Sequence, residues 1–185
     1  MPKFIVFAGP NGCGKSTLFH TNKDVFDFPR INVDEIVREN GGDWRNSVDL
    51  MHAGRLALKK YKSCIEKLES FNQETTLCGS SALRNIQQTH SLGYEVELYF
   101  VCVENVELAK ARIRKRVAAG GHGIPDVDVE RRYVESLQKL KSAIPLCKKV
   151  ELYDNTEKFR KIATIKNGQV SYLAENVPEW AKIVI

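Results

Sequence analysis

A glycine-rich segment near the start of the chain carries the residue types that can hold a row of phosphates. It consists of Gly9, Pro10, Asn11, Gly12, Cys13, Gly14, Lys15, Ser16 and Thr17, in the spacing G-x-x-x-x-G-K-S. In this pattern the glycines let backbone N–H groups turn toward phosphates, Lys15 reaches the outer phosphate oxygens, and the Ser16 hydroxyl binds Mg²⁺. An apolar run at residues 3–8 precedes the segment and a helix-like stretch follows it. The segment therefore predicts a site for ATP and Mg²⁺.

One carboxylate is placed to act on an acceptor beside that nucleotide. Asp34 follows a predicted strand at residues 28–33 and opens a predicted helix. Phosphoryl transfer needs little covalent help from a protein, but a kinase needs a carboxylate to orient and deprotonate the acceptor hydroxyl. Asp is also a favoured helix N-cap. From position alone, Asp34 is either the catalytic base or only the cap of its helix.

A second polar group ends the predicted strand at residues 70–76. Glu74 and Thr76 point to the same side of this strand, because strand residues alternate between faces. They are candidates for binding the hydroxyls of an acceptor. Solvent-facing polarity, or a cap for the next helix, is the alternative. No strand ends in a clear Walker B aspartate, which disfavours a motor ATPase.

Arginines gather before a flexible segment. Arg112 and Arg116 project from one face of a predicted helix, whereas Arg114 points away. Paired guanidinium groups suit phosphate. A closing lid would exclude water and bring such a group to the developing charge.

The segment after this helix contains His122 and leads to a further helix that carries Arg132. Its run of glycines ending in Pro125 is typical of a hinged lid. The alternative is an ordinary pair of solvated helices joined by a Gly-rich loop, in which His122 is incidental.

The elements that must position these residues alternate along the chain. Strands are predicted at residues 3–8, 28–33, 70–76, 94–103 and 149–154, and helices at residues 34–39, 47–70, 80–91, 106–119 and 127–144. This order predicts an α/β P-loop fold of the kinase type, with three α/β/α layers, a mainly parallel sheet and a helical lid. Ligands bind at the carboxyl ends of such strands, so Asp34, residues 74–76, Glu104 and Asp154 are expected to converge on the γ-phosphate.

The end of the chain follows another pattern. Two alternating runs between residues 161 and 173 flank Asn167-Gly168, which predicts a β-hairpin. We therefore expect a kinase-like domain at residues 1–156 and a hairpin extension of that domain at residues 157–185. Asp154 and Asn155 either border the adenine or form a simple turn.

Composition narrows the class of protein. The chain has 185 residues, 43% of them apolar, and a net charge of +5, which suits one core and a phosphate-rich small ligand. Its five cysteines lack C-x-x-C spacing, so free thiols in a reducing compartment such as the cytoplasm are expected. No apolar run suggests a membrane span, and nucleic acid is not favoured as a partner.

Six motifs together resemble the zeta-toxin family, more narrowly its short branch of P-loop ATPases or kinases. They are residues 9–17, 31–36, 74–76, 116–125, 131–136 and 153–155, within about residues 3–156. Members of this family are ATP-dependent kinases that phosphorylate a hydroxyl of UDP-N-acetylglucosamine and are held inactive by an antitoxin protein. The resemblance implies phosphate and Mg²⁺ roles for Lys15 and Ser16, and the role of base for Asp34.

The same resemblance implies that Glu74 and Thr76 contact the sugar nucleotide and that the Arg116 region is the phosphate-facing lid. We place Arg112, His122 and Arg132 beside the substrate as well. Two departures stand out. Where family members often carry arginines, after the position of Thr76 and ahead of the lid proline, this chain has Cys78 and the stretch at residues 122–125.

Two functions follow from these observations. The first is an ATP- and Mg²⁺-dependent kinase acting on a small-molecule hydroxyl. The second is a module whose ATP state governs a protein partner, with no hydroxyl acceptor. Phosphorylation of nucleic-acid ends would need a basic groove with aromatic platforms, and here the basic residues mostly line helix faces.

Overall fold

A seven-stranded sheet forms the centre of the computed structural model, which describes residues 1–185 except for the side chains of Asp24 and Val25. The strands are β1 (Lys3–Ala8), β2 (Arg30–Ile31), β3 (Phe71–Thr75), β4 (Glu95–Cys102), β5 (Lys149–Asp154), β6 (Arg160–Lys166) and β7 (Gln169–Leu173). Their spatial order is β2-β3-β1-β4-β5-β6-β7, and the first five are parallel. The predicted P-loop α/β fold is confirmed.

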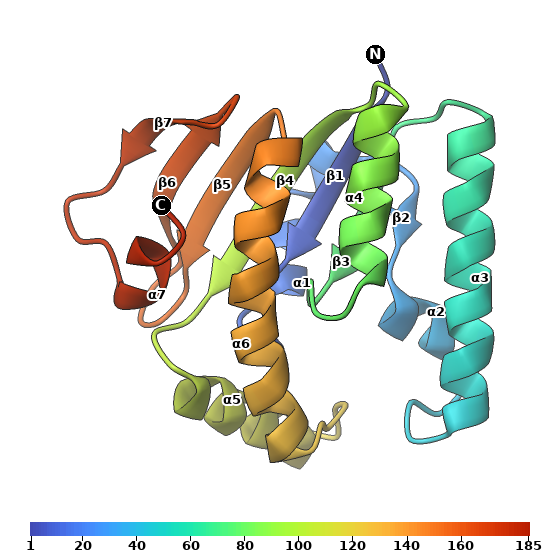
Figure 1. The fold of residues 1–185 in the computed structure, drawn as a ribbon. Helices are drawn as coiled ribbons and strands as arrows, with labels where there is room; N and C mark the ends of the chain where they lie inside the picture. Colours follow the sequence, from blue (N-terminus) through green and yellow to red (C-terminus); the bar gives the residue numbers. More distant parts are fainter.

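Helices cover both faces of the sheet. They are α1 (Lys15–Thr21), α2 (Val33–Glu39), α3 (Ser47–Glu66), α4 (Ser81–Ser91), α5 (Val106–Ala118), α6 (Asp126–Ala143) and α7 (Glu179–Lys182), with short 3-10 turns at Lys23–Phe26 and Ile144–Leu146. Helices α4 and α6 lie in front of the sheet and α1 lies behind it (Figure 1). Strands β1 and β4 are almost wholly buried, as expected for central parallel strands. None of the helices in the described part of the chain combines the length and the hydrophobicity of a membrane span.

The predicted hairpin is confirmed as β6 and β7, which pair antiparallel and extend the sheet beyond β5. Asn167 and Gly168 both have positive φ, 49° and 77°, as a tight hairpin turn requires. The short helix α7 returns to the core, where Trp180 is 3% exposed and its ring lies 6.0 Å from that of Phe100. The tail is therefore packed onto the same core as the rest of the sheet.

One predicted strand is shorter than expected. Residues 28–33 were expected to be extended, but β2 comprises only Arg30–Ile31. Pro29 has no N–H that could donate a hydrogen bond to a neighbouring strand. The side chain of Asn32 caps α2 by accepting a hydrogen bond from the Asp34 N–H. The helix therefore begins before the predicted point.

Buried carboxylates on β4 and β5 are held by lysines and tyrosines of the same or a neighbouring strand. The Glu97 carboxylate accepts hydrogen bonds from Lys3 Nζ (2.9 Å) and from the Tyr99 hydroxyl (2.7 Å). Glu151 is paired with Lys149 at 2.9 Å and accepts a hydrogen bond from Tyr153. Burial alone would raise the pKa of both carboxylates, but these partners outweigh it, so both pKa values lie below the ordinary 4.5.

Acid should therefore destabilise the fold through these two carboxylates. Because their folded-state pKa values are lowered, their contribution is complete above pH 4.5 and is lost as the pH falls through the folded-state values. Thermal unfolding midpoints measured at successive pH values below 6 should show this loss. In Lys3→Met the loss should begin at a higher pH, because Glu97 no longer has its strongest partner. The same pH dependence in both proteins would contradict the assignment.

Candidate active site

The phosphate loop connects the end of β1 to the start of α1. Gly12 and Gly14 have φ values of 79° and 101°, which L side chains rarely adopt, so glycine is required at both positions. The Asn155 amide donates a hydrogen bond to the Cys13 carbonyl oxygen at 2.9 Å, and a Cβ on Gly14 would lie 2.5 Å from that amide nitrogen. Asn155, at the end of β5, therefore braces the loop.

A cavity of about 520 Å³ opens beside this loop. Its lining includes three groups of residues: the loop with Lys15, Ser16 and Thr17; the ends of β2 and β3; and the helices α5 and α6 with the segment between them. Lys15 is buried, and its Nζ donates to the Pro10 carbonyl oxygen at 3.0 Å. Every residue that we predicted to be catalytic or substrate-binding lines this cavity: Lys15, Glu74, Thr76, Asp34, Arg112, Arg116, His122 and Arg132.

Glu74 lies directly against Ser16. The Ser16 hydroxyl donates to the two oxygens of the Glu74 carboxylate at 2.8 and 3.1 Å. This contact arises because β3 is the neighbour of β1 and pairs Phe7 with Glu74 and Ala8 with Thr75, immediately before the phosphate loop. Glu74 thus places a carboxylate beside the phosphate loop, although no Walker B aspartate was recognised in the sequence. Strand β3 lacks the apolar run that usually precedes such a residue.

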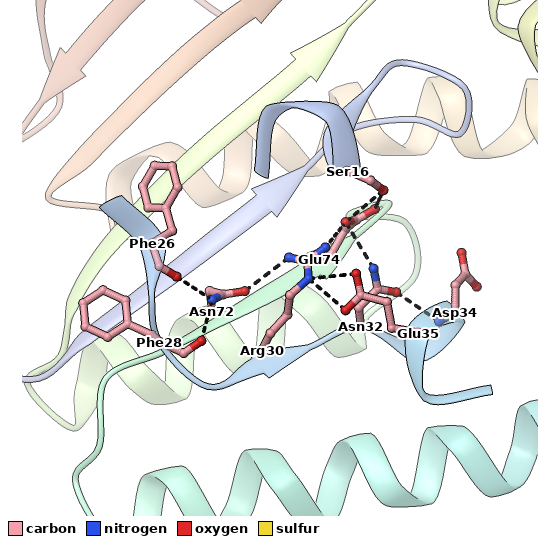
Figure 2. Close-up of polar contacts among 9 residues, drawn as sticks. All are labelled: Ser16, Phe26, Phe28, Arg30, Asn32, Asp34, Glu35, Asn72 and Glu74. Atoms are coloured by element: carbon pink, nitrogen blue, oxygen red, sulfur yellow. Dashed lines mark hydrogen bonds and ion pairs between the residues drawn. The ribbon is translucent and has the colours of Figure 1, made fainter. Parts of the chain in front are cut away.

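Arg30 holds Glu74 from the other side, as Figure 2 shows. Its guanidinium also donates to Glu35 at 2.9 Å and to the Asn72 amide oxygen at 3.3 Å, and it lies 3.6 Å from the centre of the Phe19 ring. The Asn72 side chain is completely buried and donates to the carbonyl oxygens of two residues ahead of β2. Arg30 therefore fixes the Glu74 carboxylate beside Ser16.

We expect Arg30→Lys to lower the free energy of unfolding by about 2 kcal/mol, since hydrogen bonds to partly buried carboxylates are lost. Lysine keeps the positive charge but cannot contact Glu35, Glu74 and Asn72 together, because its single ammonium lacks the planar fork of arginine. Denaturant unfolding would measure the change. Arg38→Lys, at an exposed position on α2, is the matched control and should change stability by less than about 0.5 kcal/mol. Equal effects of the two changes would contradict this role.

Asp34 is not the cap of its helix. Asn32 is the N-cap of α2, and the Asp34 side chain is exposed at the mouth of the cavity. Among the described residues, nothing donates a hydrogen bond to its carboxylate, and in Figure 2 only its backbone N–H is joined to the surrounding network. The capping alternative was therefore wrong, and a free carboxylate faces the cavity.

The three arginines of α5 lie on two different sides of the helix, as their spacing predicted. Arg112 and Arg116 line the cavity, whereas Arg114 pairs with Asp126 at 3.0 Å on the exposed side. Arg112 donates to the Thr156 carbonyl oxygen at 3.0 Å, and Arg116 Nε donates to the His122 carbonyl oxygen at 2.8 Å. These contacts tether both guanidinium groups beside the phosphate loop.

His122 and Arg132 complete this side of the cavity. One Nη of Arg132 lies 3.5 Å from the Asn11 amide oxygen, and its buried Nε has no partner among the described residues. The His122 ring contacts the Trp44 ring edge to face, with centroids 5.5 Å apart. Burial lowers the pKa of His122, the Asp34 carboxylate opposes that shift, and nearby guanidinium groups add to it. The imidazole is therefore neutral at physiological pH.

Two residues expected at this site lie elsewhere. Glu104 and Asp154 line a second cavity of about 1100 Å³ together with the C-terminal tail. Asp154 is buried and accepts hydrogen bonds from Thr156 (2.7 Å) and the Trp180 indole (3.3 Å). The side chains of Glu104 and Asp154 thus face the tail, although the next residue after β5, Asn155, contacts the phosphate loop. The expected convergence was wrong for these two residues.

Comparison with known proteins shows which family this chain belongs to. The family model described as Zeta toxin matches residues 1–177. The chain belongs to the zeta-toxin family. A curated protein of similar sequence, an uncharacterized protein of Haemophilus influenzae, is 34% identical over 131 residues, which cover 71% of this chain and 92% of that protein. The family resemblance inferred from the motifs is thus confirmed.

Solved structures of similar fold include chains from two protein complexes. In the AvrRxo1-ORF1:AvrRxo1-ORF2 complex with sulphate ions, a chain 16% identical matches with a TM-score of 0.73 over all of this chain. The same complex with ATP matches with a TM-score of 0.71 at 15% identity, covering 99% of this chain and 62% of that one. The present chain spans 64% of the length of the matching chain in the sulphate-bound complex.

The other complex is the PezAT chromosomal toxin–antitoxin system of Streptococcus pneumoniae. Its matching chain has a TM-score of 0.56 and 21% identity, and the match covers all of this chain and 77% of that one. At these identities, the likeness shows a shared P-loop kinase fold.

The motifs left parts of this zeta-toxin site unrecognised. Arg30 and Asn72 have no local signal, because they become partners only when β2 pairs with β3. Trp44 lies in the loop between α2 and α3 and contacts a histidine far along the chain. Asn32 alone was recognisable, since Asn is a favoured N-cap.

Proposed function

We propose that this protein is a Mg²⁺- and ATP-dependent kinase that transfers the γ-phosphate to a hydroxyl of a small molecule. One observation carries the proposal: the exposed Asp34 carboxylate faces the same cavity as Lys15 and the lid arginines. A base opposite a phosphate loop is what phosphoryl transfer requires. A fold neighbour crystallised with ATP supports the choice of nucleotide.

Ser16 and Glu74 fit a magnesium ion. A hydroxyl and a carboxylate within 2.8 Å of each other are hard oxygen donors, and Mg²⁺ is usually held by one or two such groups together with water and substrate phosphates. In this proposal Ser16 would bind the ion directly and Glu74 would hold its water, which adds to the acceptor-binding role expected from sequence. When bound, the ion would neutralise charge on the phosphates.

Side chains of this protein would carry out the other steps of phosphoryl transfer. Lys15 holds the γ-phosphate, and Asp34 orients the acceptor hydroxyl and takes its proton as the oxygen attacks phosphorus. The bond from phosphorus to the β–γ bridging oxygen breaks, and ADP leaves with that electron pair. Arg116, with Arg112 and Arg132, offsets the charge on the transferring group and helps exclude water. Thr76 contacts the acceptor.

Family membership supports two finer suggestions. A sugar hydroxyl, such as that of UDP-N-acetylglucosamine, is a candidate acceptor, and an antitoxin protein is a candidate partner. The alternative, a regulatory ATPase with no acceptor, has no residue-level observation in its favour, since it leaves the free Asp34 carboxylate without a role.

Incubation of the protein with Mg·ATP and a metabolite extract tests the proposal. We expect ADP release that depends on the extract, and a matching phosphorylated product detected by mass spectrometry. Slow ADP release that is unchanged by the extract, without any phosphorylated product, would favour the regulatory ATPase instead.

A further inference from the structure

We propose that Trp44 is a positioning residue that holds the lid beside the acceptor side of the cavity through its contact with His122, and so favours transfer of the phosphate to the acceptor over transfer to water. This inference rests on the proposed kinase function and adds a residue to it. Trp44 lies in the connection between α2 and α3, and His122 lies in the connection between α5 and α6. We call the second connection, residues 119–125, the lid segment. Figure 1 shows both connections at the same end of the molecule.

The rings of Trp44 and His122 meet edge to face. Their centroids are 5.5 Å apart and their planes are inclined at 88°, an arrangement that aromatic rings favour. Trp44 is half-buried and stands outside the residues that line the cavity, whereas His122 lines it together with Asp34. An effect of Trp44 on the reaction would therefore pass through His122.

Hydrogen bonds on both sides of Trp44 hold its connection in place. The Asp43 N–H donates to the Asp49 carboxylate of α3 at 2.9 Å, and the Asp43 carboxylate accepts from the Arg45 N–H at 2.9 Å. These bonds fasten the connection to α3, and α2 on its other side carries Asp34. The Trp44 ring is therefore a fixed point on the same part of the molecule as the proposed base.

The lid segment, by contrast, has few hydrogen bonds. Gly120 at its start has a φ of 83°, a conformation that favours glycine. Among the described residues, the backbone N–H groups of residues 122–124 donate to no partner, and the His122 carbonyl oxygen accepts from Arg116 Nε at 2.8 Å. A segment with so few backbone bonds opens at little cost in free energy. One side-chain contact can therefore control where the lid segment lies.

The His122 imidazole is not fully satisfied in this position. Its Nδ1 atom is buried and has no hydrogen-bond partner among the described residues. A buried polar atom without a partner costs free energy, which offsets part of the gain from the contact with Trp44. A neutral imidazole can donate or accept, so a hydroxyl of an entering acceptor can pair with it. The lid segment can therefore open to admit an acceptor and close again over it.

The position of the lid segment affects where the phosphate goes. The Asp34 carboxylate is exposed, and a base that activates an acceptor hydroxyl can also activate water. When water replaces the acceptor, its oxygen attacks phosphorus, ADP leaves and inorganic phosphate forms. A closed lid excludes water. Arg112 and Arg132 are held by Thr156 and the phosphate loop, so loss of Trp44 should favour water without removing these charges.

Partition of the phosphate between acceptor and water tests this inference. Each protein is incubated with Mg²⁺, γ-labelled ATP and a metabolite extract, and the ratio of inorganic phosphate to labelled organic product is measured. We expect Trp44→Ala to raise this ratio about fivefold, as loss of one aromatic pair allows. Trp44→Phe keeps an edge-to-face ring and is the matched control, with a change of less than about twofold. Equal ratios in Trp44→Ala and the unmodified protein would overturn the role of Trp44 and leave the kinase intact.

The same measurement in a His122→Ala background shows whether Trp44 acts through His122. There, Trp44→Ala should change the ratio no further, because the contact is already absent. A further fivefold rise would mean that Trp44 acts by another route, and the inference would be wrong. If the unmodified protein makes no labelled organic product, the proposed function itself fails, and this inference fails with it.

Tryptophan fluorescence tests the contact without any acceptor. The chain has two tryptophans, and Trp180 is only 3% exposed, so added acrylamide quenches mainly the emission of Trp44. We expect His122→Ala to raise the acrylamide quenching constant, because the imidazole covers one side of the indole. Val127→Ala, an exposed change just after the lid segment, is the control and should leave the constant unchanged. The same constant in His122→Ala and the unmodified protein would show that the two rings are not in contact in solution, and would overturn the inference.

Discussion

Asp34→Asn is expected to lower the turnover of acceptor phosphorylation by about 10²- to 10⁴-fold, the usual contribution of a general base. Asparagine keeps the size of the side chain but cannot take the acceptor proton. Binding of ATP should be nearly unchanged, because the Asp34 side chain is exposed and its backbone N–H keeps its bond to the Asn32 cap. Steady-state kinetics with the identified acceptor, together with ATP titration, would measure both quantities.

Glu39→Gln provides a matched control for that change. Glu39 is an exposed carboxylate near the end of the same helix, away from the cavity, and its loss should leave turnover within about twofold. If Asp34→Asn kept full turnover, another group would have to accept the proton and the proposed mechanism would fail. If Asp34→Asn abolished ATP binding as well, the effect would be structural.

Gly9→Ala is expected to lower the free energy of unfolding by about 4 kcal/mol, near the upper end for single substitutions. Gly9 has φ +141°, and a Cβ there would lie 2.0 Å from the backbone oxygen of Val101 in the central strand β4. Neither strand can move without disturbing the sheet. Denaturant unfolding would measure the loss, and nucleotide binding should fall with it because the phosphate loop begins at this residue.

Gly54→Ala is the control for a glycine that needs no special conformation. Gly54 lies within α3, and nothing stands within 4 Å of a Cβ built there. This substitution should raise the free energy of unfolding by about 0.5–1 kcal/mol through helix propensity. Opposite signs for the two substitutions would confirm the close approach at Gly9, and a loss below about 1 kcal/mol in Gly9→Ala would disprove it.

Local patterns were sufficient for most of the fold. The phosphate loop, the alternation of strands and helices and the Asn167-Gly168 turn are each encoded by neighbouring residues, so the P-loop fold and the hairpin were predicted correctly. Spacing on one helix also predicted that Arg112 and Arg116 would face the site while Arg114 would not. Such features depend on periodicity and turn chemistry, which are properties of short segments.

The environment of each site residue depended on strand order, which the sequence alone did not show. With β3 beside β1, Glu74 meets Ser16, whereas Glu104 and Asp154 face a second cavity that the C-terminal tail completes. The pairing of β2 with β3 brings Arg30 to Glu74, and the packing of α6 brings Glu135 to Gly79. The sequence by itself determined the nucleotide half of the site, because one contiguous loop forms it. Only the tertiary structure decided which side chains face that loop across the cavity, because strands and helices distant in the chain supply them.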